Sequence, residues 1–218
     1  MNLDSVLNFL GRNGFDREKL VVIKDESQML LSLVKTVSWT NQFSLIESLY
    51  YEKFIPQAEL LDGEANQEVS KLQQDYGVEI DYENEAYYET IRFGYLALYH
   101  KLENCRKELL KTMLPVFRLS DKEFKKKYEA YFKENFDKPR SGIVYKFSWI
   151  SDCTKHQNAI ASERGNQPPN FENYPKGIKI KINKEEFKND SKELRMNFKK
   201  LCMNSALIGV MHELDNMK

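Results

Sequence analysis

Three polar residues gather near the end of a predicted helix: Lys155, His156 and Asn158. They follow an apolar-striped segment that begins at Trp149, and a Pro-rich loop comes after them. An imidazole with a pKa near neutrality transfers protons in either direction, and an ammonium group attracts phosphate. These residue types indicate phosphodiester chemistry that needs no metal ion. The alternative is a boundary histidine that hydrogen-bonds a carbonyl while the lysine beside it is solvated.

A second polar group lies on the helix predicted over residues 83–114. Arg92 and Glu103 share one stripe beside its apolar seam, and His100 lies just outside. The separation of Arg92 and Glu103 is too long for a direct ion pair, so we expect each to meet a charge on another helix. If the helix predicted over residues 143–161 packs across this stripe, both polar groups join in one catalytic site. Ordinary ion pairing between helices is the alternative.

The element that must position these residues is the long helix over residues 83–114. Its apolar side chains recur at two heptad positions through nearly four heptads, which predicts a helix of roughly 45 Å ending at Pro115. One position holds Tyr88, Tyr95, Leu102 and Leu109, and the other holds Ile91, Leu98, Cys105 and Thr112. A seam of this length requires a partner helix.

The segment 185–215 supplies that partner, with Phe187, Leu194 and Leu201 on its seam and His212 near its end as a packed or capping residue. The two long amphipathic helices predict a mainly α fold, an antiparallel helical bundle. Strict apolar alternation over residues 177–182 predicts one short β-strand. Residues 20–23, or the same strand in another subunit, are its expected partners.

The remaining segments are also predominantly helical. Short helices are predicted over residues 3–10 and 122–136, the latter with a capping box formed by Ser120 and Glu123. A helix from about residue 27 continues until Pro56 kinks or restarts it, and Gly77 ends the next helix. Together these elements predict a single helical domain over residues 1–218, with N-terminal helices over 1–80 and a core bundle over 83–215.

The charge of the chain is balanced overall but unevenly distributed. Residues 41–90 contain 12 acidic and 2 basic residues, and residues 91–218 hold the compensating positive charge. One half of the chain therefore meets an anionic partner, or the two halves neutralise each other within the fold or across a dimer. The lysines of residues 122–127 and 176–200 favour a solvated surface beside core aromatics, on which nonspecific phosphate contact is easily built.

The cysteine pattern and the hydropathy favour a cytoplasmic protein. The 3 cysteines are too scattered for a disulfide framework, so we expect reduced, buried thiols. Ligand pairs with metal spacing are absent, and neither a metal nor a cofactor is expected. The N-terminus does not resemble a signal peptide, and no window reaches the ~18 apolar residues of a membrane span.

The helical bundle over residues 83–215 and the polar segment KHQNAIAS at residues 155–162 are similar to the HEPN superfamily of helical nucleotide-binding domains. In that family an arginine and a polar residue precede a histidine. Here Lys155 replaces the arginine, and no histidine follows the polar residues. The resemblance implies a dimeric, metal-independent RNase of toxin–antitoxin or phage-defence systems, with Lys155, His156 and Asn158 as the corresponding residues.

These observations lead to two main hypotheses. The first is a HEPN-like helical protein that binds or cleaves RNA, or binds a nucleotide. His156 then transfers the proton, Lys155 and Arg92 hold the phosphate, and His100 or Glu103 assists. The second is a non-enzymatic interaction or dimerisation protein whose long seams self-associate or hold a partner. A homodimer without membrane contact is expected in both, and a small-molecule sensor with residues 163–176 as a lid is a third possibility.

Overall fold

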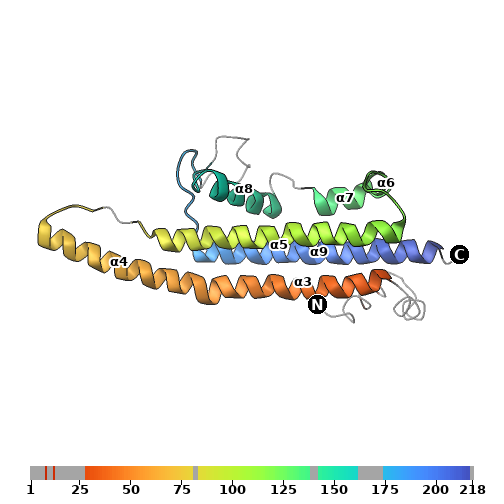
Figure 1. The fold of residues 1–218 in the computed structure, drawn as a ribbon, viewed down its shortest axis with the longest axis horizontal. Helices are drawn as coiled ribbons and strands as arrows, with labels where there is room; N and C mark the ends of the chain where they lie inside the picture. The colour runs from red at the N-terminus through yellow and green to blue at the C-terminus, as the bar shows by residue number, and fades with distance from the viewer. Residues whose placement is uncertain are drawn as a thin grey trace. The chain divides into compact units, whose positions relative to one another are not determined.

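The computed structural model describes residues 8, 12, 28–80, 83–137, 142–161 and 174–216. Nearly all of this part of the chain is helical (Figure 1), which confirms the mainly α fold class. The elements are α3 (Gln28–Leu49), the π-helical turn η1 (Tyr50–Phe54), α4 (Ile55–Tyr76), α5 (Glu85–Phe117), α6 (Asp121–Lys127), α7 (Glu129–Phe136), α8 (Ile143–His156) and α9 (Lys184–Asn216). Apart from residue 8, the helix predicted over residues 3–10 lies outside the described residues.

The chain divides into two compact units that are each discontinuous in sequence. Unit 1 takes its described residues from Met1–Ser44, Lys101–Lys138 and Leu194–Lys218, and unit 2 takes them from Leu45–His100 and Pro139–Glu193. Helices α3, α5 and α9 contribute residues to both units. The single domain with segments 1–80 and 83–215 stays a prediction.

A π-helical turn accommodates the proline at the start of α4. Within a helix, a proline ring clashes with the carbonyl one turn earlier and cannot donate a hydrogen bond to it. Immediately before Pro56 the helix widens, and the N–H of Ile55 reaches back to the carbonyl of Tyr50. The kink or restart predicted at Pro56 therefore takes the form of η1 followed by α4. Gly77, with a φ of 65°, ends α4 as predicted.

The long helix α5 confirms the predicted seam. Of the seam residues, Ile91, Tyr95, Leu98, Leu102, Cys105 and Leu109 are buried. The predicted end at Pro115 is wrong, because α5 continues through this proline to Phe117. Arg118, with a φ of 50°, lies just after the helix. Its left-handed conformation turns the chain out of the helical path.

Helices α5 and α9 run parallel to each other in unit 2. The hydroxyl of Tyr87 accepts a hydrogen bond from the N–H of Lys184, and Tyr95, further along α5, donates to Asp190, further along α9. The antiparallel arrangement predicted for this pair is therefore wrong. The segment between them contains other helices and returns the chain to the same end, so the short-loop argument for antiparallel neighbours does not apply. In unit 2, α4 is antiparallel to α5, since Tyr50 lies beside Gly94 while Asp62 bonds the start of α5.

In unit 1 the predicted helix over residues 122–136 is two helices. The capping box at the start of α6 is confirmed, since the Ser120 hydroxyl accepts from the Glu123 N–H and the Glu123 carboxylate accepts from the Ser120 N–H. Tyr128, with φ and ψ of −116° and 41°, separates α6 from α7. Aromatic packing holds the pair, because Phe124 contacts both Tyr128 and Tyr131.

In unit 2 the strand predicted over residues 177–182 is not present as a strand. Ile160 and Lys179 form one isolated antiparallel bridge, and no longer strand occurs among the described residues. The partner segment is short, since α8 ends at His156 rather than at the predicted residue 161. Only a few backbone bonds form there, including Ile180 N–H to the Ala159 carbonyl at 2.8 Å. The alternating apolar residues Ile180 and Ile182 are nevertheless buried.

Candidate functional site

The predicted residues Lys155, His156 and Asn158 lie at the exposed end of α8 in unit 2. One face of helix α8 is buried, and these three side chains lie on the other side, at its C-terminal end, exposed to solvent. The buried residues include Val144, Phe147, Ile150 and Cys153. With the other described residues, none of the three side chains forms a hydrogen bond or an ion pair. The imidazole is accessible, but the described residues provide no group that orients it.

The backbone is strained directly after this polar segment. Asn158 and Ala159 have φ values of 49° and 62°, in the left-handed region. Asparagine tolerates this region, whereas alanine loses roughly 1–2 kcal/mol there. Ala159 is buried, and its N–H donates to the Cys153 carbonyl at 3.0 Å. Strained backbone of this kind is common at functional sites, so the end of α8 stays a candidate site.

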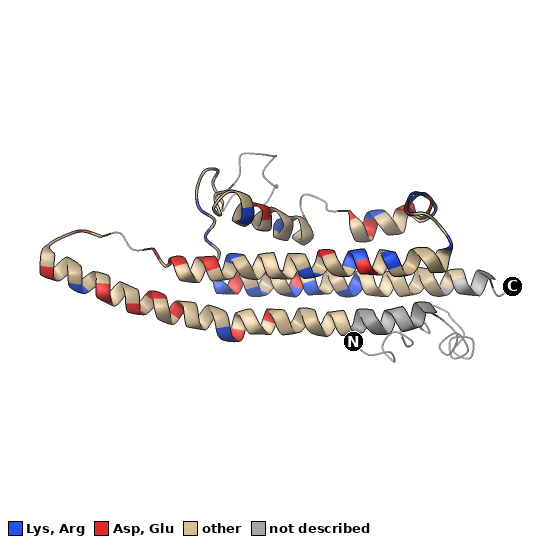
Figure 2. Ribbon diagram, in the orientation of Figure 1, with Lys and Arg blue, Asp and Glu red and all other residues tan. Residues whose placement is uncertain are grey.

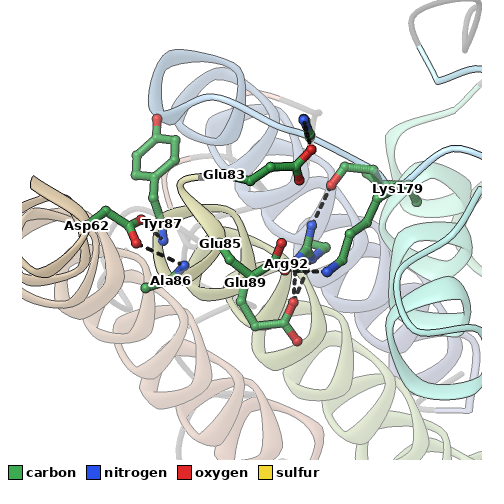
Figure 3. Close-up of polar contacts among 10 residues, drawn as sticks. Asp62, Glu83, Glu85, Ala86, Tyr87, Glu89, Arg92 and Lys179 are labelled. Carbon is green, nitrogen blue, oxygen red and sulfur yellow. Dashed lines mark hydrogen bonds and ion pairs between the residues drawn. The ribbon is translucent and has the colours of Figure 1, made fainter. Parts of the chain in front are cut away.

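Arg92 lies at the centre of a polar network on α5 (Figure 3). Its side chain is 0% exposed. The guanidinium donates to Glu85 Oε1 at 2.6 Å, to Glu89, and to the carbonyl of Ile180 at 2.7 Å. Lys179 Nζ lies 2.6 Å from Glu85 Oε1. Burial raises the pKa of Glu85, but the hydrogen bonds and charges of Lys179 and Arg92 outweigh this and lower it below its ordinary value.

This network corrects the expected partner of Arg92. We expected a charge on another helix, but Glu85 and Glu89 belong to α5 itself. The guanidinium is sealed from solvent and bonded on several sides, so it is not open to a phosphate in this arrangement. Among the described residues, no contact joins Arg92 to Lys155 or His156. The network instead ties the start of α5 to the segment before α9.

The other two predicted site residues both lie on α5 but belong to different units. His100 is exposed and belongs to unit 2, whereas Glu103 belongs to unit 1. Glu103 Oε1 lies 3.6 Å from Nη1 of Arg106, one turn later in α5. This partner is on α5 itself, whereas the sequence-based expectation for Glu103 was a charge on another helix. Arg106 in turn donates to the carbonyl of Asn135 at 2.9 Å.

A second polar cluster in unit 2 was not predicted from the sequence. Lys146 Nζ lies 2.8 Å from Glu186 Oε1 and 2.5 Å from Asp190 Oδ2. Tyr95 donates to Asp190, and Tyr174 donates to Glu186. Burial raises the pKa of Asp190, and burial together with the neighbouring carboxylates raises the pKa of both tyrosines. The sequence gives one signal for this cluster, the spacing of four residues between Glu186 and Asp190 on one face of α9. It does not show that Lys146 of α8 pairs with them, because that is a tertiary contact.

This cluster joins α5, α8 and α9 through polar contacts. Each of its charged side chains already bonds an opposite charge, and each tyrosine donates to a carboxylate. Satisfied networks of this kind hold elements in a unique arrangement. The cluster therefore fixes α5, α8 and α9 of unit 2 against one another.

Part of the uneven charge is neutralised within unit 2. Three lysines between the bridge and the start of α9, Lys179 of the bridge included, form ion pairs with acidic residues. These acidic residues lie on α4, before α5 or at its start. The pairs are Lys179 with Glu85, Lys181 with Glu83, and Lys184 with Glu59. Of the two explanations for the asymmetry, mutual neutralisation within the fold accounts for these residues. Figure 2 shows further acidic residues along α4. Glu64, Glu68 and Asp75 form no ion pair with the other residues that the structure describes.

Unit 2 also exposes apolar side chains on η1, α4 and α5. Phe54 and Phe93 are each 45% exposed, and Leu61 is 51% exposed. They border an open groove of about 330 Å³ whose lining also includes Ala58 and Thr90. This volume is at the lower end of ligand pockets and suits one large side chain. The sequence predicted the helix between Pro56 and Gly77 but not this groove.

The described residues include neither a candidate membrane-spanning helix nor a candidate metal site. None of the helices in this part of the chain is long and apolar enough to cross a membrane. Within the same residues, no group of three or more His, Cys, Asp and Glu side chains is placed to hold a metal ion. Cys105, Cys153 and Cys202 are buried and form no disulfide.

The resemblance to the HEPN superfamily stays a prediction, and it rests on the residues at the end of α8 and on the helical fold. Comparison with family models, with curated proteins and with solved structures finds no match to this chain.

Proposed function

We propose that this chain is a non-enzymatic helical interaction protein that binds a partner through α4. The observation that supports this proposal is the exposure of the second half of that helix. From residue 67 to Tyr76 no residue is buried. Even the large apolar side chains of Leu72 and Tyr76 are exposed there, at 46% and 74%. Contiguous exposed apolar side chains mark interaction surfaces.

Helix stability gives a second reason. Isolated helices shorter than ~12–15 residues are marginal in water, and most helical stability in proteins comes from packing an apolar face. The end of α4 is tied to the rest of unit 2 by polar bonds, such as Asn66 to Asn84 at 2.9 Å and Gln73 to the Ile80 carbonyl at 2.8 Å. A partner that covers the apolar side chains would supply the missing packing.

The long seams do not serve this purpose. Most seam residues of α5 and α9 are already buried within a single chain, so neither seam is free for coiled-coil pairing. The homodimer expected from the seams would need another surface. We also propose a cytoplasmic location, because the three cysteines are buried and form no disulfide.

Site-specific photo-crosslinking in the native host cell tests the interaction. A photoreactive amino acid replaces Leu72 in one variant and Met196, which is 62% exposed on α9, in the control variant. We expect a discrete adduct at position 72 that maps to a helical segment of one protein and is absent at position 196. Equal labelling at both positions, or none at position 72, would contradict the proposal.

A HEPN-like ribonuclease role, in a toxin or phage-defence system, is a second proposal. Lys155 and His156 are exposed next to the strained residues Asn158 and Ala159, and this observation favours it. The test is RNA cleavage by the purified chain and by His156→Ala, each with a thermal melt. Cleavage that disappears in a folded His156→Ala variant supports the ribonuclease. Equal results for both proteins, without salt-dependent RNA affinity, support the non-enzymatic role.

A further inference from the structure

Five apolar residues of α4 form one stripe, of which Leu61, Leu72 and Tyr76 are exposed and Ala65 and Val69 are half-buried. Leu61, Ala65, Val69, Leu72 and Tyr76 recur at spacings of three and four, so they lie on one face of the helix. Leu61 also borders the groove between α4 and α5. The stripe therefore begins at the groove and follows α4 toward its C-terminus.

Carboxylates lie along one side of this stripe. At about 100° per residue, Glu64, Glu68 and Asp75 project within roughly 60° of its edge. All three are exposed. Figure 2 shows acidic residues along α4, whose single basic residue is Lys71. The groove, the stripe and the carboxylates all belong to unit 2.

We propose that this surface binds a basic amphipathic helix of a partner protein, an inference that rests on the interaction role proposed above. A large apolar side chain of the partner fills the groove between Phe54, Leu61 and Phe93. Further apolar residues cover Leu72 and Tyr76. Lysine or arginine side chains along the partner's flank pair with the carboxylates, as in other helix-in-groove complexes.

The negative charge beside the stripe favours a basic helix over a second copy of this chain, a nucleic acid or an anionic membrane. Two copies of α4 packed along their stripes would bring Glu64, Glu68 and Asp75 near the same residues of the second copy, and like charges repel. Nucleic acids and anionic membranes are repelled for the same reason. A basic helix gains both the burial of the apolar stripe and the attraction of the carboxylates.

Fluorescence anisotropy with synthetic helices tests the inference. The probe is a labelled peptide of roughly 18 residues with leucine and one tryptophan on one face and lysine on the other. The matched probe has glutamate at every lysine position. We expect the full chain to bind the lysine peptide with an affinity that falls as salt is added, and to bind the glutamate peptide at least tenfold more weakly, roughly the effect of several exposed ion pairs.

Variants locate the site. Phe93→Ser removes a groove wall and should weaken the lysine peptide by roughly thirtyfold, the effect of losing an interface hot spot. Replacing Glu64, Glu68 and Asp75 together by their amides should weaken it by about tenfold and flatten the salt dependence. Met196→Ser removes an exposed apolar side chain of unit 1 and should leave the affinity unchanged. Circular dichroism verifies that each variant is folded.

Three results would overturn the inference: equal affinity for both peptides, equal weakening by Met196→Ser and Phe93→Ser, or no binding of the lysine peptide. A dimer in sedimentation that Phe93→Ser dissociates would assign the groove to a second copy instead. If the peptides fail while the adduct at Leu72 persists, the interaction role stands and only the basic chemistry of the partner is wrong.

Discussion

The replacement of Arg92 by methionine distinguishes a structural arginine from a phosphate-binding one. Methionine keeps much of the apolar stem and removes the guanidinium, so the core of unit 2 stays filled. The carbonyl of Ile180, which accepts from Arg92 at 2.7 Å, then loses this donor. Glu85 and Glu89 lose an ion pair but remain partly exposed, at 42% and 39%.

The magnitude follows from these three contacts. A buried carbonyl left without its donor costs about 1–3 kcal/mol. Each ion pair with a solvated carboxylate contributes about 0–1 kcal/mol, and Lys179 still neutralises Glu85. We therefore expect Arg92→Met to lower the free energy of unfolding by about 2–4 kcal/mol. Glu89→Gln, which keeps an acceptor, should lower it by less than about 1 kcal/mol.

Urea unfolding followed by far-UV circular dichroism measures these differences, with Lys111→Met as the control. Lys111 forms an exposed pair with Glu108, so its loss should change stability by less than about 0.5 kcal/mol. The pH adds a signature, because the pKa of Glu85 is lowered below its ordinary value of 4.5. Its stabilising contribution is present above pH 4.5 and is lost as the pH falls through the lowered pKa, so wild type and Arg92→Met should converge in acid.

An Arg92→Met variant as stable as the wild type, but weaker in RNA or phosphate binding, would refute this reasoning. Arg92 would then hold a ligand, as the sequence-based hypothesis states.

Three further predictions follow from packing and ionisation. Gly63→Ala should raise the free energy of unfolding by about 0.5–1 kcal/mol in a thermal or urea melt, because a Cβ there meets nothing within 4 Å. Gly94→Ala should lower it by about 1–3 kcal/mol, because its Cβ would lie 2.7 Å from a ring carbon of Phe187. The folded-state pKa of Tyr174 is raised above its ordinary value of 10.0, so stability should fall as the pH rises above 10, and less steeply in Tyr174→Phe; an identical slope in both proteins would contradict this. Burial raises the pKa of Cys105 to about 11 and of Cys202 to about 12, so a thiol reagent at neutral pH should label them only at the rate of unfolding, and immediate labelling of the native chain would contradict it.

Much of the helical architecture could be predicted because it depends on local patterns. The seam of α5, the capping box at Ser120 and the end of α4 at Gly77 were all visible as spacings or as single residue types. The helix ends at Pro115 and residue 161 were missed. At the first, tertiary packing outweighs the local preference of proline, and at the second, α8 ends in left-handed residues that are not glycine.

The packing of the helices against one another was harder to predict from the sequence. Periodicity identifies apolar faces but not the direction in which two helices pack, so the parallel pair α5 and α9 was predicted as antiparallel. The same limit applies to the polar groups. Arg92 and Glu103 were expected to reach other helices, yet each has a carboxylate or guanidinium partner one or two turns away on α5. The cluster around Lys146 needs contacts between α8 and α9 that no spacing reveals.

Hydrogen exchange on α4 tests the interaction surface most directly. The amides of residues 67–76 lie in the part of α4 that has no buried side chains, so they should exchange early in the free chain. Saturating amounts of the lysine peptide should slow their exchange by at least about tenfold, as expected when a covered helix must open against the binding free energy, and leave α6 and α7 unchanged. Unchanged exchange in α4 with the peptide bound, or protection confined to other helices, would contradict the assignment of this face as the binding surface.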